Sequence, residues 1–156
     1  MYHRMKNHKH GLFARMGGAF NRCFFILEMY GDDLEPDYIS SVLAQKPTKA
    51  YRKGDERPKG SQYYRTGAWI INSGEVLLTD EQSGSHQLEL WLSTLQSEIA
   101  RWEQLYERYS PQIRLVIYTD QMNAEFKLTP IAMQELSSRG LPLVIDPYLE
   151  LDDDEV

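Results

Sequence analysis

Apolar side chains recur every three or four residues between Ser85 and Tyr109, and polar side chains such as Gln96 and Glu103 occupy positions between them. This spacing is typical of a helix with one apolar face. Pro111 ends the pattern, because proline has no amide to donate and disfavours helix at the preceding residue. We therefore predict one long helix over residues 85–109, whose apolar face requires a large apolar surface to lie on.

The other patterned stretches are shorter and predict a sheet. Residues 22–30 are almost continuously apolar, which indicates a central strand buried on both faces. Residues 124–128 alternate apolar and charged side chains, which indicates a strand with one wet face, paired in a hairpin with a strand over 113–118. Further strands are predicted over 48–52, 63–71 and 141–145, with helices over about 36–45 and between Pro130 and Gly140.

The predicted order of elements is therefore β-α-β-β-α-β-β-α-β. Helices that alternate with hairpins favour an α+β fold, in which a largely antiparallel sheet has its helices packed on one face. A chain of 156 residues suits one such domain. We assign residues 22–149 to the domain, 1–21 to a flexible N-terminal extension and 150–156 to an acidic tail.

Charge is spread unevenly over a net total of −6. Residues 1–22 hold five basic and no acidic residues, whereas residues 150–156 hold five acidic ones. An acidic body argues against a nucleic-acid partner, because such binding depends on neutralising phosphates. No apolar run approaches the ~20 residues of a membrane span, and the single cysteine, Cys23, suits a reducing cytoplasm.

Recognisable catalytic motifs are absent from the sequence, and His86 is the only histidine within the predicted domain. We expect no catalytic residue, no metal and no cofactor. The acidic turn at Asp32, Asp33, Glu35 and Asp37 has the oxygen ligands that Mg²⁺ prefers, but acidic residues at a helix start also complement its dipole. The basic loop from Arg52 to Arg65 is suited to binding a phosphate or, alternatively, to pairing with that acidic turn.

Several short motifs resemble a bacterial family known as domain of unknown function 4279. They are the block Tyr30-Gly31-Asp32-Asp33-Leu34-Glu35-Pro36-Asp37-Tyr38-Ile39, followed by Val42-Leu43, Lys46-Pro47-Thr48, Arg52-Lys53-Gly54-Asp55 and Gly67-Ala68-Trp69. The resemblance covers about residues 22–149. It implies no catalytic residues and no cofactor, and it implies a small immunity-type protein, since some members look like such proteins encoded beside secreted toxins.

Two functions follow from these observations. The first is a cytoplasmic protein-binding module, an immunity or antitoxin-like inhibitor that neutralises a toxin by direct binding. Its expected contact residues are Asp32, Asp33, Asp37, Tyr38, Arg52, Lys53, Asp55 and Tyr64. The alternative is a small-ligand or phosphate-handling enzyme that uses the Asp32–Asp33 turn and the Arg52–Arg65 loop.

Overall fold

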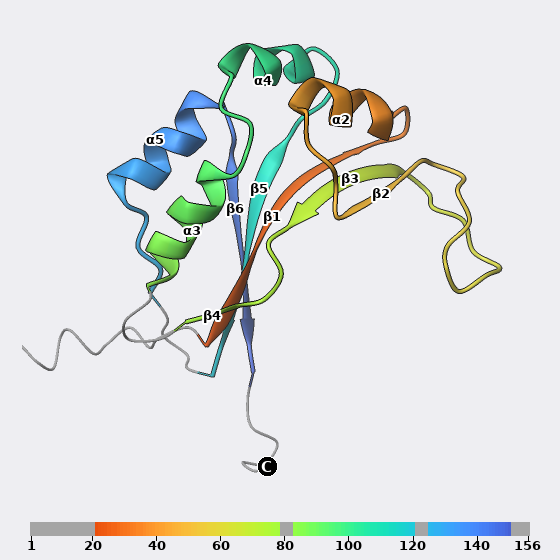
Figure 1. Ribbon diagram of the computed structural model, residues 1–156. Coiled ribbons are helices and arrows are strands. Elements are labelled where there is room, and N and C mark those ends of the chain that lie inside the picture. The colour runs from red at the N-terminus through yellow and green to blue at the C-terminus, as the bar shows by residue number, and fades with distance from the viewer. Residues whose placement is uncertain (1–20, 79–82, 121–124, 151–156) are drawn as a thin grey trace, which may run out of the picture.

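A computed structural model describes residues 21–78, 83–120 and 125–150 of the chain. Four helices and six strands lie within these residues (Figure 1). In chain order they are β1 (Arg22–Gly31), α2 (Pro36–Leu43), β2 (Lys49–Tyr51), β3 (Gly67–Asn72), β4 (Val76–Leu77), α3 (Gly84–Ser93), α4 (Ile99–Tyr106), β5 (Gln112–Thr119), α5 (Pro130–Ser138) and β6 (Leu143–Leu149).

The strands form one sheet in the order β2-β3-β1-β5-β6, and the short β4 pairs with the start of β1. Every pairing is antiparallel except that of β5 with β6, which is parallel. A parallel pair requires a crossover connection, and α5 supplies it between these two strands. The prediction of an α+β fold with a largely antiparallel sheet is thereby confirmed.

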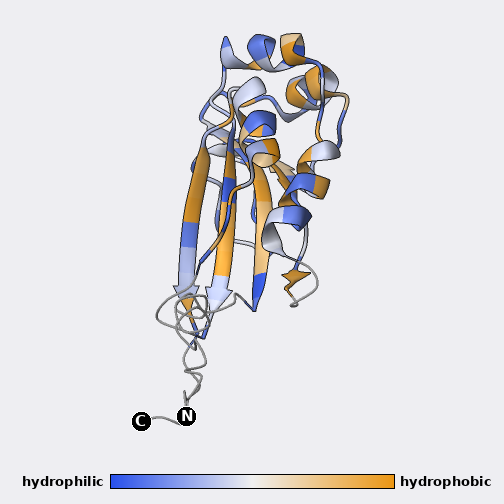
Figure 2. Cartoon of the chain, turned by 90° about the vertical axis from the view of Figure 1, so that its left-hand side faces the viewer, coloured by the Kyte–Doolittle hydropathy of each residue, from blue (hydrophilic) through white to orange (hydrophobic). Residues whose placement is uncertain are grey.

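One face of the sheet carries the hydrophobic core. Successive side chains of a strand point to opposite faces, and Cys23, Phe25, Leu27 and Met29 of β1 alternate along the strand and are all fully buried. They pack with apolar side chains from β3, β5 and the helices, among them Trp69, Ile113, Leu115, Leu88 and Trp102. The helices pack against this face in two pairs, α3 with α5 and α2 with α4 (Figures 1 and 2).

The prediction of one long helix over 85–109 is wrong, because the chain folds as α3 and α4 with a break at residues 94–98. Gln96 joins the break to the end of α2 and to the start of α4. Its amide Nε2 donates to the Leu43 carbonyl at 2.8 Å, and its Oε1 accepts from the Glu98 amide at 3.0 Å. Its own backbone amide donates to Gln45 at 2.9 Å. The break lets α3 pack beside α5 and α4 beside α2.

The predicted hairpin after β5 is also not formed. Ala124 lies outside the described residues, and residues 125–129 form no strand. The apolar–polar alternation there has another cause: Phe126 and Leu128 are partly buried against the core, while the Lys127 carbonyl accepts from the Ser85 hydroxyl. The neighbours of β5 in the sheet are instead β1 and β6. In the described chain the element order therefore differs from the prediction in two ways: α3 and α4 are adjacent helices, and α5 follows β5 with no hairpin strand between them.

Asn21 and Glu150 are both hydrogen-bonded to β5. The Asn21 amide donates to Tyr118 at 3.0 Å, and the Glu150 amide donates to Thr119 at 2.8 Å. Both residues, assigned above to the extension and the tail, are therefore joined to the sheet. Residues 1–20 and 151–156 lie outside the described part. Within that part, no helix has the length and apolar character needed to cross a membrane.

Cys23 should resist thiol reagents until the protein unfolds. Burial in the helix-side core raises the pKa of its thiol to about 12, so the reactive thiolate is nearly absent at neutral pH. With Ellman's reagent at pH 8 we expect no measurable reaction in native buffer and one thiol per chain in denaturant. Rapid native labelling would contradict the packing of β1 against the helices.

Candidate functional site

The acidic turn at the start of α2 and the basic loop after β2 lie against each other. Arg52 Nη2 is 2.9 Å from Asp37 Oδ2, and Lys53 forms an ion pair with Asp32. The Arg52 amide donates to Asp55 Oδ2 at 2.7 Å. The hydrogen bond from Lys53 lowers the pKa of Asp32. Of the two interpretations of the basic loop, pairing with the acidic turn is the one that these contacts support.

The other three expected contact residues flank this cluster. Asp33 is exposed, and its charge contributes to raising the pKa of Lys53, although the bond from Lys53 to Asp32 is the main cause. The Tyr38 ring lies beneath the Arg108 guanidinium, at 4.5 Å from its centroid. Tyr64 stacks on Tyr51 with ring centroids 3.5 Å apart. The eight residues therefore belong to one end of the sheet, but most of their charges are already paired within the chain.

A different set of side chains occupies the sheet face opposite the helices, which we call the open face. Strand alternation and register place them together, because residues paired across strands point to the same side. They are Lys49 and Tyr51 of β2, Ile70 of β3, Phe24, Ile26, Glu28 and Tyr30 of β1, Gln112, Arg114, Val116 and Tyr118 of β5, and Val144, Asp146 and Tyr148 of β6. Figure 2 shows hydrophilic bands interrupting the otherwise apolar strands.

Glu28 is the centre of a hydrogen-bonded ion network on the open face. It is only 3% exposed. Its Oε1 accepts from Arg114 Nε at 2.9 Å and from Gln112 Nε2 at 2.7 Å, and its Oε2 accepts from the Tyr30 hydroxyl at 3.1 Å. Arg114 also reaches Asp146 on β6, at 3.4 Å. The network therefore fixes side chains of β1, β5 and β6 relative to one another.

The pKa shifts follow from this network. Burial, together with the neighbouring Glu28 carboxylate, raises the pKa of Tyr30 to about 12, so at neutral pH Tyr30 keeps its proton and donates a hydrogen bond to Glu28. Burial lowers the pKa of Arg114, but the Glu28 and Asp146 carboxylates outweigh burial and raise it overall. Both side chains are therefore held in the protonated state that the network requires.

Comparison with known proteins identifies the family but supplies no characterised relative. The family model described as "Domain of unknown function (DUF4279)" matches residues 21–150, which is most of the chain. The chain belongs to the DUF4279 family. No curated protein and no solved structure matches. The matched range starts and ends at Asn21 and Glu150, the same residues that join the sheet at its two ends.

In this DUF4279 chain an aromatic cluster continues the network across the open face. Tyr118 and Tyr148 stack with centroids 5.3 Å apart, and Phe24 meets Tyr118 edge-on at 6.0 Å. The Arg22 guanidinium lies 3.9 Å from the Tyr118 ring centroid, and the Tyr148 hydroxyl donates to Asp146 at 3.2 Å. Tyr148 is nevertheless 46% exposed, so the cluster is ordered and open to solvent at once.

Sequence reasoning missed the open face as a candidate site. Glu28 sits within an apolar run that was interpreted as buried on both faces, and Tyr148 lies beyond the predicted end of the last strand. One signal was present: Gln112 and Arg114 alternate with apolar residues in β5, which indicates a half-open strand. Among the described residues, no group of three or more His, Cys, Asp or Glu side chains is arranged to hold a metal ion.

Proposed function

We propose that this DUF4279 chain is a cytoplasmic protein-binding module that acts as an immunity or antitoxin-like inhibitor and covers its partner with the open face. The observation that carries the proposal is the ordered, half-exposed cluster of Tyr118, Tyr148 and Arg22 beside the Glu28 network. Aromatic and arginine side chains are enriched at the energetic centres of protein interfaces.

The cluster is held in place before any partner arrives. Side-chain ordering normally costs binding free energy, on the order of 0.5–1.5 kcal/mol for each long side chain immobilised. Here Tyr148 is already tied to Asp146, and Arg22 is tied to Glu75 at 3.1 Å and stacked on Tyr118. Much of that ordering cost is therefore met by folding, which favours tight binding through this face.

The chemistry of the partner is suggested by charge. The whole chain carries −6, while the open face itself mixes both signs. A net negative body attracts a basic protein over distance, and toxins that act on nucleic acid are often basic, so such a toxin fits as the partner. The ion pairs at Asp32 and Asp37 reduce the contribution of the acidic turn to this attraction. The buried, unpaired Cys23 is compatible with a reducing cytoplasm.

The proposal predicts that open-face tyrosines are required for protection against a cognate toxin. The experiment co-expresses this chain with the protein encoded beside its gene, scoring growth and measuring binding by surface plasmon resonance. Replacing Tyr118 and Tyr148 by alanine should abolish protection and raise Kd at least about 30-fold, mainly through faster dissociation. Added salt should slow association of the unmodified protein.

A matched control comes from the helix side. Ile131 and Met133 of α5 are exposed large side chains, and their double alanine variant should keep both protection and affinity. Circular dichroism would first establish that both double variants fold. The proposal would be overturned if the protein encoded beside the gene did not impair growth when expressed alone. It would also be overturned if the α5 variant lost protection while the tyrosine variant kept it.

A further inference from the structure

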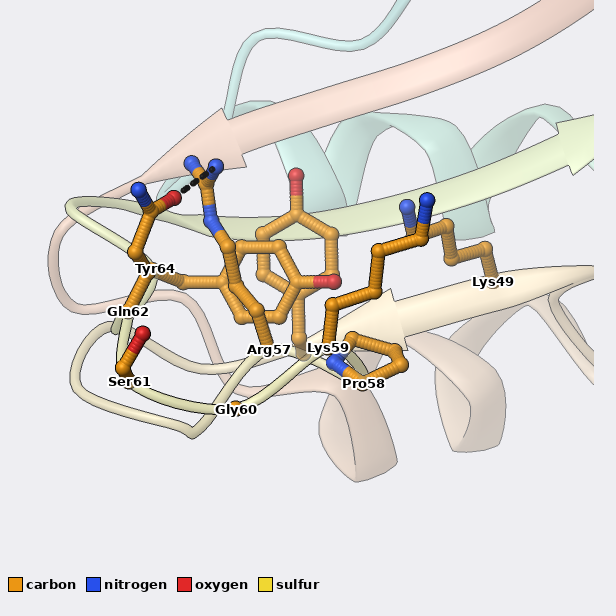
Figure 3. Close-up of a pocket in the computed structure, with 9 residues that line it drawn as sticks. Lys49, Arg57, Pro58, Lys59, Gly60, Ser61, Gln62 and Tyr64 are labelled. Atoms are coloured by element: carbon orange, nitrogen blue, oxygen red, sulfur yellow. Dashed lines mark hydrogen bonds between the residues drawn. The ribbon is translucent and has the colours of Figure 1, made fainter.

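The hairpin between β2 and β3 walls a hollow at the β2 end of the open face. Its volume is about 720 Å³, and it is lined by Lys49, Tyr51, Tyr64 and residues 57–62 (Figure 3). This volume lies within the range of small-molecule sites, which runs from about 300 to 1,000 Å³. The hollow is therefore large enough for a phosphorylated metabolite or a nucleotide.

Backbone hydrogen bonds give the hairpin a defined shape. The Arg57 amide donates to the Gln62 carbonyl at 2.8 Å, and the Gly60 amide donates to the Arg57 carbonyl at 3.0 Å. Gly60 and Ser61 both have left-handed backbone angles, with φ of 69° and 64°, which close the turn between these bonds. The closed turn carries Arg57, Lys59 and Ser61 on one short segment of the wall.

The basic side chains that line the hollow differ from the other basic residues nearby in having no ion-pair partner among the described residues. Arg52 and Lys53 are used in ion pairs with Asp37 and Asp32. Within the described part of the chain, by contrast, no carboxylate lies within ion-pair distance of Lys49, Arg57 or Lys59. Arg57 Nη1 has only a long bond of 3.4 Å to the Gln62 amide oxygen, and its guanidinium lies 5.2 Å from the Tyr64 ring centroid.

Lys49 and Lys59 are the two lysines of the hollow. Figure 3 shows Lys49 and Lys59 both lining the hollow, whereas the Arg57 guanidinium is turned toward Gln62. An anion bound in the hollow would be attracted by both ammonium groups. Within the described residues, Lys49, Arg57 and Lys59 line one hollow with no carboxylate at ion-pair distance, and in a protein of net charge −6 they form a local site for an anion.

We propose that this hollow binds the phosphate group of a small phosphorylated molecule, with Lys49 and Lys59 as the charged ligands of the phosphate. A phosphate has more acceptor oxygens and more charge than a carboxylate, so it gains more than a carboxylate does from two ammonium groups on one hollow. The hydroxyl of Ser61 supplies a further donor on the same wall. The inference goes beyond protein binding and does not depend on it.

Pyrophosphate is a suitable probe, followed through the backbone amide signals of the hairpin in ¹H–¹⁵N NMR at constant ionic strength. We expect saturable shifts concentrated in residues 57–62. The double variant Lys49→Gln/Lys59→Gln should weaken binding at least about tenfold, because it removes two charge-assisted contacts. Both lysines are exposed, so the variant should unfold at the same temperature as the unmodified protein.

Two controls decide whether the effect is local and specific to phosphate. Lys46 and Lys127 are also exposed and do not line the hollow, so Lys46→Gln/Lys127→Gln removes the same charge and should change Kd less than twofold. Succinate, a dianion without phosphate, should bind at least tenfold more weakly than pyrophosphate. Equal weakening by both double variants, equal binding of succinate, or no saturable shift in the hairpin would each overturn the proposal.

Discussion

Trp102→Ala should lower the free energy of unfolding by about 3–5 kcal/mol, the cost of emptying a large aromatic site in a core. Trp102 is fully buried at the centre of α4 and belongs to the hydrophobic core, and α4 packs beside α2. Its indole Nε1 also donates to the Gln96 carbonyl at 2.8 Å, which joins α4 to the break that precedes it. Chemical denaturation with urea, followed by circular dichroism, measures the change.

Two further variants separate packing from hydrogen bonding at this position. Trp102→Phe keeps most of the buried ring but loses the donor, and it should cost about 1–2 kcal/mol. The Gln96 carbonyl would still accept from Arg139 Nε at 2.9 Å, so it is not left without a partner. Glu103→Ala, on the exposed side of the same helix, should change stability by less than about 0.5 kcal/mol. Similar losses for Trp102→Ala and Glu103→Ala would show that α4 buries a different face.

The position of Trp102 illustrates what the sequence can and cannot predict. Its place in the apolar period identifies it as core, and the period continues through the break because Leu95 and Trp102 are both buried. The break itself depends on Gln96, whose partners are Leu43 and Gln45 at the end of α2. A glutamine between two apolar positions has the pattern of a wet helix face. Only the packing of α2 against α4 makes it a connecting residue.

The hairpin predicted after β5 failed for a related reason. Alternation reports only that every second side chain is buried, and it does not distinguish a paired strand from an extended segment lying on the core. Phe126 lies on α3 in this way, since a side chain at Gly84 would come within 2.7 Å of its ring. The parallel pairing of β5 with β6 joins segments separated by α5, so no local pattern could have indicated it.

The candidate site was predictable in part. Residues 32–37 and 52–55 form ion pairs with each other, as one of the two interpretations of the basic loop predicted. The two segments carry opposite charges, and the fold brings them close together. The open face was missed, because Glu28 is a single charged residue in a run of apolar ones. Its burial makes sense only once Gln112 and Arg114 are known to lie opposite it on β5.

Glu28→Ala should destabilise the protein by about 2–4 kcal/mol. Removing one member of a buried ion pair leaves the other charge without compensation, which typically costs about 3–5 kcal/mol. The expected loss here is somewhat smaller, because the Arg114 side chain is 30% exposed and keeps its contact with Asp146. Glu28→Gln retains an acceptor oxygen for Arg114 and should cost about 1 kcal/mol. Urea unfolding at pH 7 measures both.

A surface acid without a partner in the described chain provides the comparison. Glu107 is exposed, and Glu107→Ala should leave the unfolding free energy within about 0.5 kcal/mol of the unmodified protein. If Glu28→Ala were equally silent, the network would be a set of independent surface contacts and would order nothing.

The Glu28→Gln variant also tests how the side chains of the open face are held in place. Glu28 holds Tyr30 directly, and it holds Asp146 and Tyr148 through Arg114. Glu28→Gln should therefore fold nearly as well as the unmodified chain yet bind the protein partner more weakly, because Arg114 and Tyr148 would have to be ordered during association. An unchanged Kd in that variant would mean that the tyrosines order themselves by stacking alone and that Glu28 serves only the stability of the sheet.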